Sequence, residues 1–366
     1  MKVADVTRYL ETIAPRAYQE SYDNAGLLTG QPDWDVTGIL VTLDCLETVV
    51  EEAVAKNCNL IVAHHPIVFK GLKKLTGSNY VERTVIKAIQ HNIAIYATHT
   101  NLDHVHRGVN RKIGEKLGLK NLRILSPRPG TLSKLVTFIP EADADRVMQA
   151  LHEAGAGQIG NYKNCSFRLR GTGTFMPNEE ANPHIGQALQ QEYVDEVRAE
   201  VIFPTHLQDN ILRTLRKSHP YEEVAYYINP VANDNQEVGA GMVGELEEPL
   251  DSVAFLRKVK QDMGLSVIRH TAPISKPVSR VAVCGGAGIF LLQDAIRAGA
   301  QAFITADVKY HEFFDADNRI LLADIGHYES EVFTKDLLVT LLNEKFPTFA
   351  VNFSGTITNP VRYLTD

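Results

Sequence analysis

Short apolar runs alternate with helical patterns in the first third of the chain. The runs are rich in aliphatic and β-branched residues, as in strands that are buried on both faces. They predict strands at 36–43, 59–63 and 93–97. The stretches between and after them predict helices at 46–56, 80–91 and 108–117. Alternation of this kind indicates βαβ units and a mostly parallel sheet.

The pattern changes after the turn-forming residues 126–130, which read SPRPG. The predicted elements of the following segment are a strand at 135–139, a helix at 143–154, strands at 165–173 and 196–204, a helix at 207–217 and a strand at 224–228. This β-α-β-β-α-β order is typical of a ferredoxin-like module of the PII/CutA kind, and residues 219–223 are similar to a CutA stretch. We therefore predict an inserted α+β domain at 127–233.

The first pattern resumes after residue 233. The predicted elements there are strands at 278–284, 302–306 and 320–325, and helices at 290–298 and 329–345. The two flanks, 1–126 and 234–366, are expected to form one mostly parallel-sheet α/β domain that is split in sequence. The N-terminal residues 1–15 have an amphipathic helix pattern rather than that of a secretory leader.

Composition narrows the class of protein. Of 366 residues, 44% are hydrophobic, which is enough for a large core, and the formal net charge of -7 argues against broad nucleic-acid binding. No apolar stretch approaches the ~18–20 residues that span a bilayer. The four cysteines are scattered without CxxC spacing, as in reduced cytosolic proteins. We expect a cytoplasmic globular protein without a membrane or nucleic-acid partner.

Residues of metal-ligand type follow three of the predicted strands. Because the carboxyl ends of parallel strands share one edge of a sheet, we expect these residues to meet there. His327 and Glu331 stand one helical turn apart, so they share a helix face. The predicted ligands are His64, His65, Asp103, His327 and Glu331.

This ligand set suits two divalent metal ions per subunit. Mixed imidazole and carboxylate ligands favour zinc, with manganese, iron or cobalt as alternatives, over magnesium or calcium. We assign Glu331 as the bridge between the ions, since a carboxylate has two oxygens to share. Five protein ligands leave positions for water and substrate, as in a reactive site. A single histidine is more often an ordinary hydrogen-bonded residue, so the prediction depends on the convergence of all three segments.

Four motifs resemble the GTP cyclohydrolase 1 type 2 homologue family, also called the NIF-three-like family, in its longer bacterial form. They are YDNAGLL at 22–28, AHHP at 63–66, THTNLD at 98–103 and GHYESE at 326–331. One departure is Tyr22, where many relatives carry Trp. The resemblance implies metal ligands at the same five positions, a toroidal homohexamer, and a PII-like insert.

Two function classes remain open. The first is a metal-dependent hydrolase acting on a nucleotide or related small molecule, either by GTP cyclohydrolase-type ring opening or by phosphoester cleavage. The second is a non-catalytic metal-binding hexameric scaffold or a regulatory sensor. His99 and His104 are the candidate catalytic residues for proton transfer, with orientation of a ligand as the alternative for each.

Weaker candidates surround this set. The glycine turn at 284–288 could bind a phosphate on its amides or serve only tight packing. Lys70, Lys73 and Lys74 could bind phosphates or form a solvated loop. Asp307, Lys309 and His311 could contact substrate, with a hydrogen bond at a helix start as the alternative for Asp307.

Overall fold

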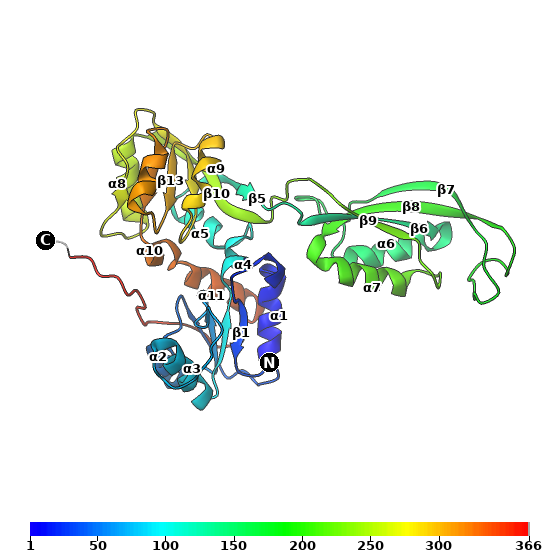
Figure 1. Ribbon diagram of the computed structural model, residues 1–366, viewed down its shortest axis with the longest axis horizontal. Helices are drawn as coiled ribbons and strands as arrows, with labels where there is room; N and C mark the ends of the chain where they lie inside the picture. Colours follow the sequence, from blue (N-terminus) through cyan, green and yellow to red (C-terminus); the bar gives the residue numbers. More distant parts are fainter. Residues whose placement is uncertain (365–366) are drawn as a thin grey trace. The chain divides into compact units, whose positions relative to one another are not determined.

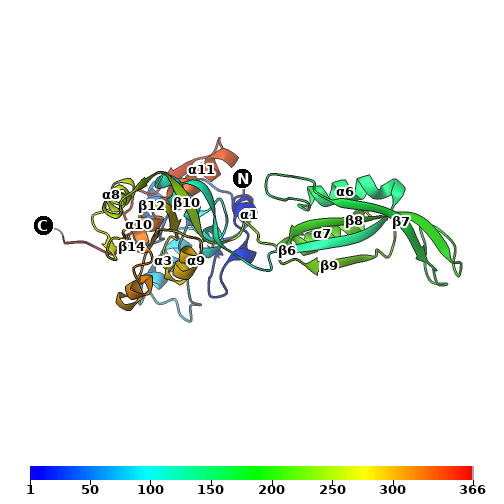
Figure 2. The ribbon, with the colours of Figure 1, turned by 90° about the horizontal axis from the view of Figure 1, so that it is seen from above.

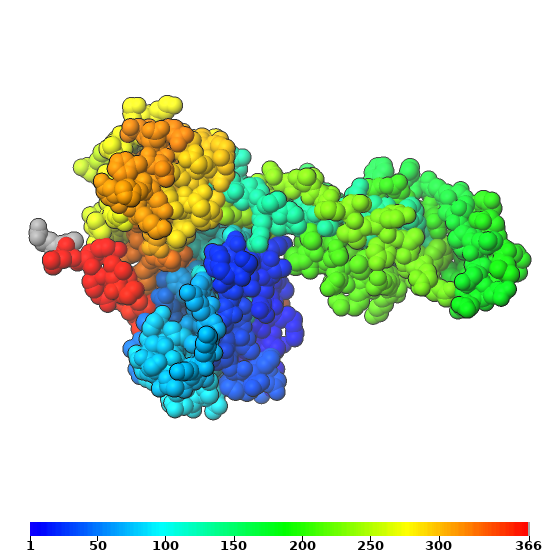
Figure 3. All heavy atoms as spheres, viewed as in Figure 1, coloured from blue at the N-terminus to red at the C-terminus, as the bar shows by residue number. Residues whose placement is uncertain are grey.

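The chain has a mixed α/β fold with three sheets. A computed structural model describes residues 1–364, which divide into two compact units, one of residues 1–127 with 237–364 and one of Arg128–Gln236. Figures 1 and 2 show the elements of each unit, and in Figure 3 the unit of Arg128–Gln236 is drawn in greens. Within residues 1–364, none of the helices has the length and apolar character that a membrane crossing requires.

The first sheet of the discontinuous unit has five strands in the order β1-β4-β3-β2-β15. These are β1 (Gly26–Thr29), β2 (Ile39–Thr42), β3 (Leu60–Ala63), β4 (Ala94–Ala97) and β15 (Val351–Phe353). All pairs are parallel except β1 with β4. Every residue of β2, β3 and β4 is buried, because helices cover both faces. One face packs against α2 (Glu47–Ala55) and α3 (Tyr80–Gln90), and the other against α1 (Val3–Ile13) and α11 (Thr334–Lys345).

The second sheet of this unit has six strands in the order β11-β14-β13-β12-β10-β5. These are β5 (Lys120–Pro127), β10 (Gly239–Leu250), β11 (Arg269–His270), β12 (Val278–Val283), β13 (Ala302–Thr305) and β14 (Leu321–Asp324). Only β12, β13 and β14 run parallel. One face packs against α5 (Val109–Lys116) and α8 (Ser252–Asp262), and the other against α9 (Leu292–Arg297).

Two expectations about this unit are wrong. The flanks form two sheets rather than one, because β10 pairs with β5 across the inserted segment and completes a second sheet. The long helix predicted at 329–345 is two helices, α10 (His327–Glu331) and α11, which begins at Thr334. The break lets α10 end beside a polar cluster while α11 buries Leu338 and Leu342 in the core.

The second unit contains one antiparallel sheet and two helices. Its elements follow in the order β6 (Leu132–Pro140), α6 (Ala144–Glu153), β7 (Phe167–Phe175), β8 (Glu192–Pro204), α7 (Gln208–Ser218) and β9 (Tyr226–Pro230). The strands lie in the order β7-β8-β6-β9. Both helices pack on the same face of the sheet, as Figure 1 shows. The opposite face carries no helix of this unit.

Candidate metal centre

The structure brings all five predicted metal ligands into one cluster, but from two sheets rather than from one edge. His64 and His65 follow β3, and Asp103 ends the short helix α4 (Thr100–Asp103) after β4, so these three come from the first sheet. His327 and Glu331 lie on α10, which follows β14 of the second sheet. The expected single sheet edge is therefore wrong, and the cluster lies where the ends of two sheets meet.

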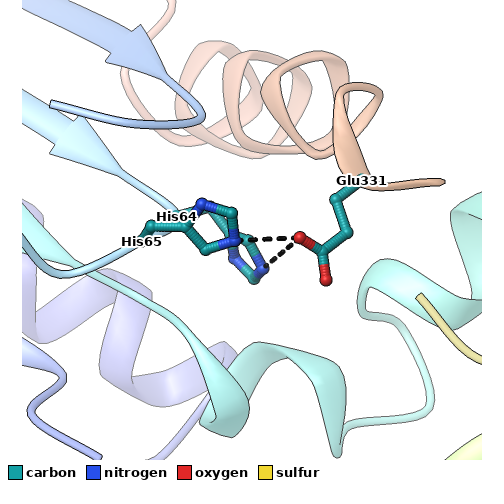
Figure 4. A group of neighbouring side chains, drawn as sticks. All are labelled: His64, His65 and Glu331. Atoms are coloured by element: carbon teal, nitrogen blue, oxygen red, sulfur yellow. Dashed lines mark hydrogen bonds and ion pairs between the residues drawn. The ribbon is translucent and has the colours of Figure 1, made fainter. Parts of the chain in front are cut away.

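Glu331 is the common partner in this cluster. Its Oε2 lies 2.9 Å from Nε2 of His65 and 3.0 Å from Nε2 of His327. The same oxygen is 4.0 Å from Nε2 of His64, which in turn lies 3.6 Å from Oδ1 of Asp103. Figure 4 shows both rings of the histidine pair directed at the Glu331 carboxylate. Nitrogen and oxygen atoms of His64, His65 and Glu331 all lie within 4.8 Å of one another, a spacing that a metal ion could bridge.

The outer nitrogen of each ring has an acceptor of its own. Nδ1 of His64 lies 2.8 Å from the carbonyl oxygen of Thr98. Nδ1 of His65 lies 2.7 Å from a carboxylate oxygen of Asp44, and Nδ1 of His327 lies 2.7 Å from one of Asp307. These contacts direct each Nε2 toward the cluster. Metal-binding histidines are typically oriented in this way.

Two atoms at the centre are buried without a hydrogen-bond partner within residues 1–364. They are Nε2 of His64 and Oδ1 of Asp103, which face each other. A buried polar atom that lacks a partner costs about 1–3 kcal/mol. A divalent cation between these atoms would satisfy both. The donor set of three imidazoles and two carboxylates therefore fits a transition-metal site.

Burial and neighbouring charges shift the pKa values of the clustered side chains in different directions. Burial, reinforced by the charge of Glu331, raises the pKa of Asp103 well above its usual value. Burial also lowers the pKa of His64 to about 3, which keeps this ring neutral and able to ligate. Burial opposes charge on Glu331 as well, but hydrogen bonds from His327 and His65 outweigh it and hold its pKa well below the usual value.

The protonated rings of His65 and His327 offset the negative charge of Glu331. Burial disfavours the charged ring of His65, but its hydrogen bonds to Asp44 and Glu331 outweigh that effect and raise its pKa to about 10. The same balance of burial against Glu331 and Asp307 raises the pKa of His327 to about 9. Since imidazole must lose its proton on the ligating nitrogen to bind a metal, metal binding here would release protons.

The glycine turn at 284–288 packs against Glu331. A Cβ atom on Gly286 would lie 2.5 Å from Oε1 of Glu331, and the φ of Gly286 is +59°, which favours glycine. The amide of Gly286 donates to Ser330, that of Gly285 to Asn110 and that of Gly288 to Thr305. The turn thus uses three of its amides internally, which supports the packing interpretation over the phosphate-binding one.

The two predicted catalytic histidines differ in position. The ring of His99 lies 5.5 Å from the rings of both His64 and His65, measured between centroids, and its Nδ1 lies 2.8 Å from a carboxylate oxygen of the buried Asp23. His104 points elsewhere. Its Nδ1 lies 2.9 Å from the carbonyl oxygen of Tyr18, and its Nε2 lies 3.4 Å from the carboxylate of Glu20.

Two cavities open beside the cluster, and both are lined by Asp44, His65 and Pro360. The smaller, about 450 Å³, also includes His327 and Asp307. The larger, about 1060 Å³, extends past Phe69, Lys70 and Tyr80.

Only some of the lysines and of residues 307–311, named above as possible substrate or phosphate contacts, lie beside the cluster. Of the three loop lysines, only Lys70 lines a cavity beside the cluster. Asp307 holds His327, whereas Lys309 and His311 line neither of the two cavities.

Sequence reasoning missed three carboxylates that hold the rings. It left Asp23 and Asp44 without a role, and it assigned Asp307 to substrate or to a helix start. Asp44 follows β2 directly, at the same end of the sheet as His64 after β3, and this position is the signal that could have identified it. Asp23 stands within the motif at 22–28.

Comparison with known proteins agrees with these motifs. Residues 1–360 match the Duf34/NIF3 (NGG1p interacting factor 3) family. The chain is 36% identical to a protein of Halalkalibacterium halodurans over 100% of both chains, and 37% identical to one of Bacillus subtilis over 98% of both. Each relative is named "GTP cyclohydrolase 1 type 2 homolog".

Solved structures give the same result. A Bacillus cereus protein related to NIF3 superposes with a TM-score of 0.88 at 34% identity, covering 100% of this chain and 99% of that one. A Staphylococcus aureus protein superposes with a TM-score of 0.79 at 31% identity over the same shares of the two chains. On this evidence the chain belongs to the Duf34/NIF3 family.

Proposed function

We propose that the cluster binds two divalent metal ions and that the protein is a hydrolase acting on a nucleotide or a related small molecule. The observation that carries the proposal is the convergence of three Nε2 atoms and two carboxylates, with every outer ring nitrogen already held by another group. His64 and Asp103 would hold one ion, and His65 and His327 the other. Glu331 would be shared, because it lies within reach of all three rings.

Hydrolysis at this site needs a Lewis acid that activates a water molecule and a side chain that carries a proton. A divalent ion, when bound, supplies a Lewis acid that lowers the pKa of a water molecule to about 7. Zinc is our first choice, with manganese, iron or cobalt as alternatives. His99 would carry the proton, because Asp23 holds its Nδ1 and no hydrogen bond within residues 1–364 occupies its Nε2. His104 is less suited, since both of its ring nitrogens face groups outside the cluster.

The larger cavity supports a nucleotide-like substrate. A nucleotide offers a flat apolar base and an anionic phosphate, and Phe69, Tyr80 and Lys70 line this cavity together with His65. Both GTP ring opening and phosphoester cleavage are compatible with such a site. The products distinguish them, since ring opening at C8 followed by hydrolysis releases formate and phosphoester cleavage releases phosphate or a nucleoside.

A nucleotide panel tests this proposal. Metal-loaded protein should turn over at least one nucleotide, and His64→Ala should abolish the reaction, whereas the exposed His91→Ala should not change it. His99→Asn should lower turnover by about 10²–10⁴-fold and leave metal content intact. Equal turnover by His64→Ala would identify a contaminant. Full metal content with no turnover across the panel would favour the metal-binding scaffold or sensor instead.

The middle unit and the assembly complete the proposal. The order β-α-β-β-α-β with strands arranged β9-β6-β8-β7 supports a ferredoxin-like, PII/CutA-like domain. The resemblance to the longer bacterial family members supports a cytoplasmic homohexamer. Light scattering should give a mass close to six chains of 40.6 kDa, and a monomer mass would contradict this part.

A further inference from the structure

The middle unit has a hollow on the sheet face that carries no helix. Val197, Ala199 and Val201 of β8 pack with α6 and α7, so Glu196 projects from the opposite face, since side chains alternate along a strand. Across the ladder, Gly171 of β7 pairs with Glu196 and Gly173 pairs with Val194. A Cβ atom on Gly171 would meet no atom within 4 Å. Glycine within a strand often marks the close approach of a ligand.

The hollow is part of a cavity of about 570 Å³. This volume is within the range of about 300–1,000 Å³ that is usual for small-molecule sites. Most of its wall is aromatic or aliphatic. The apolar lining side chains are Phe138, Leu169, Phe175, Met176, Ile185 and Tyr221.

A buried carboxylate lies within this apolar wall. Glu196 is 8% exposed, and the only hydrogen bond to its carboxylate within residues 1–364 comes from the hydroxyl of Tyr221, at 2.9 Å from Oε1. Its Oε2 lies against the backbone of Gly173, where a Cβ atom would be only 2.1 Å away. No lysine, arginine or histidine of the described chain forms an ion pair with it. A buried carboxylate without a cation is costly unless another group supplies one.

Three basic side chains line the cavity: His184, whose ring lies 6.4 Å from that of Tyr221, and two arginines that are already paired. Arg198 pairs with Glu200 and Arg170 pairs with Glu141. Glu222 and Glu223 also line the cavity, so the unpaired charge facing it is negative. Such a site would repel phosphates and carboxylates and attract a cation.

We propose that this cavity binds a small, mostly aromatic or apolar molecule that carries a positively charged nitrogen, with the nitrogen paired to Glu196. The site lies in the middle unit, and it does not depend on the metal centre or on the proposed hydrolase activity. It gives the middle unit a ligand-binding role of its own.

Three indole compounds of similar size that differ in charge test the proposal on the full metal-loaded chain. Tryptamine carries an ammonium group, 3-ethylindole is neutral and indole-3-propionate is an anion. By calorimetry and saturation-transfer NMR, tryptamine should bind at least tenfold more tightly than either of the others. Glu196→Gln should remove that preference. Glu200→Gln is the matched control, because Glu200 lies two residues further along β8 and is already paired by Lys134 and Arg198.

A second variant separates ligand binding from folding. Gly171→Val places a side chain in the open hollow, and β-branched residues are favoured in strands, so the variant should fold with an unchanged melting temperature. It should no longer bind tryptamine. The proposal is wrong if tryptamine binds no better than 3-ethylindole, or if Gly171→Val and Glu196→Gln bind it as the wild type does. Failure of tryptamine to bind together with a changed assembly mass for Gly171→Val would instead identify a contact between copies of the chain.

Discussion

Replacing Asp307 by asparagine removes the carboxylate that orients one imidazole of the proposed metal centre. Oδ2 of Asp307 lies 2.7 Å from Nδ1 of His327, and no other group holds that nitrogen within residues 1–364. The φ of Asp307 is +55°, a region that asparagine adopts readily, so the backbone should tolerate the change. The variant therefore perturbs the charge on the acceptor more than the fold.

The expected magnitude follows from that contact. Loss of a group that orients a metal-bound histidine typically lowers metal affinity by about 10–100-fold. The asparagine oxygen can still accept a hydrogen bond, and the side chains of His327 and Asp307 are 40% and 52% exposed, so we expect the lower end of this range. Tenfold corresponds to about 1.4 kcal/mol. Only one ion should be affected, because His64 is held separately by the Thr98 carbonyl.

Stepwise titration of metal-free protein with zinc, in competition with a chromophoric chelator, measures both affinities. The Asp307→Asn variant should weaken one step about tenfold and leave the other unchanged. Asp317→Asn is the matched control, since Asp317 also has a positive φ, of 47°, and is not among the cluster residues. Equal weakening of both steps, or no weakening of either, would refute the assignment of separate ligands to two ions.

Two further predictions concern the glycine turn at 284–288, which packs against Glu331, and Glu52, which binds residues 354–356 near the end of the chain. Gly286→Ala should displace Glu331 and lower the affinity of the protein for both metal ions, as measured by metal content after dialysis. Gly264→Ala is the control, because Gly264 also has a positive φ but open space around its Cβ, so this variant should change stability alone. Burial opposes charge on Glu52, but the hydrogen bonds it accepts from Lys56 and residues 354–356 outweigh that effect and lower its pKa from 4.5 to about 2. The shift corresponds to at most about 3 kcal/mol of stability, and to less where solvent screens the pair with Lys56. Because the folded-state pKa is depressed, this stability is present above about pH 4.5 and is lost as pH falls toward 2, so the difference in unfolding free energy between wild type and Glu52→Gln should shrink over that interval. A pH-independent difference would contradict this reasoning.

The convergence of the five clustered residues could be predicted because their signals are local. Each of the three segments follows an apolar run that ends in a turn, and the pairing of His327 with Glu331 requires only a helical turn. The buried strands β2, β3 and β4 were equally visible, since all their residues except Thr42 are apolar.

The arrangement of the sheets could not be predicted in the same way. The second sheet depends on the pairing of β5 with β10, which are separated in sequence by the whole middle unit. The partners of the ring nitrogens are also distant in sequence from their histidines. Asp44 and His65 are 21 residues apart, and Asp23 and His99 are 76 apart. Only the packed chain brings these groups together.

The metal content per chain is the most direct test of whether Glu331 bridges two metal ions. Purified protein reconstituted with zinc and then dialysed should contain two divalent ions per chain by elemental analysis, and Glu331→Ala should contain neither while retaining its helical and strand content by circular dichroism. Two ions retained by Glu331→Ala, or fewer than two in the wild type, would contradict the proposed two-metal centre.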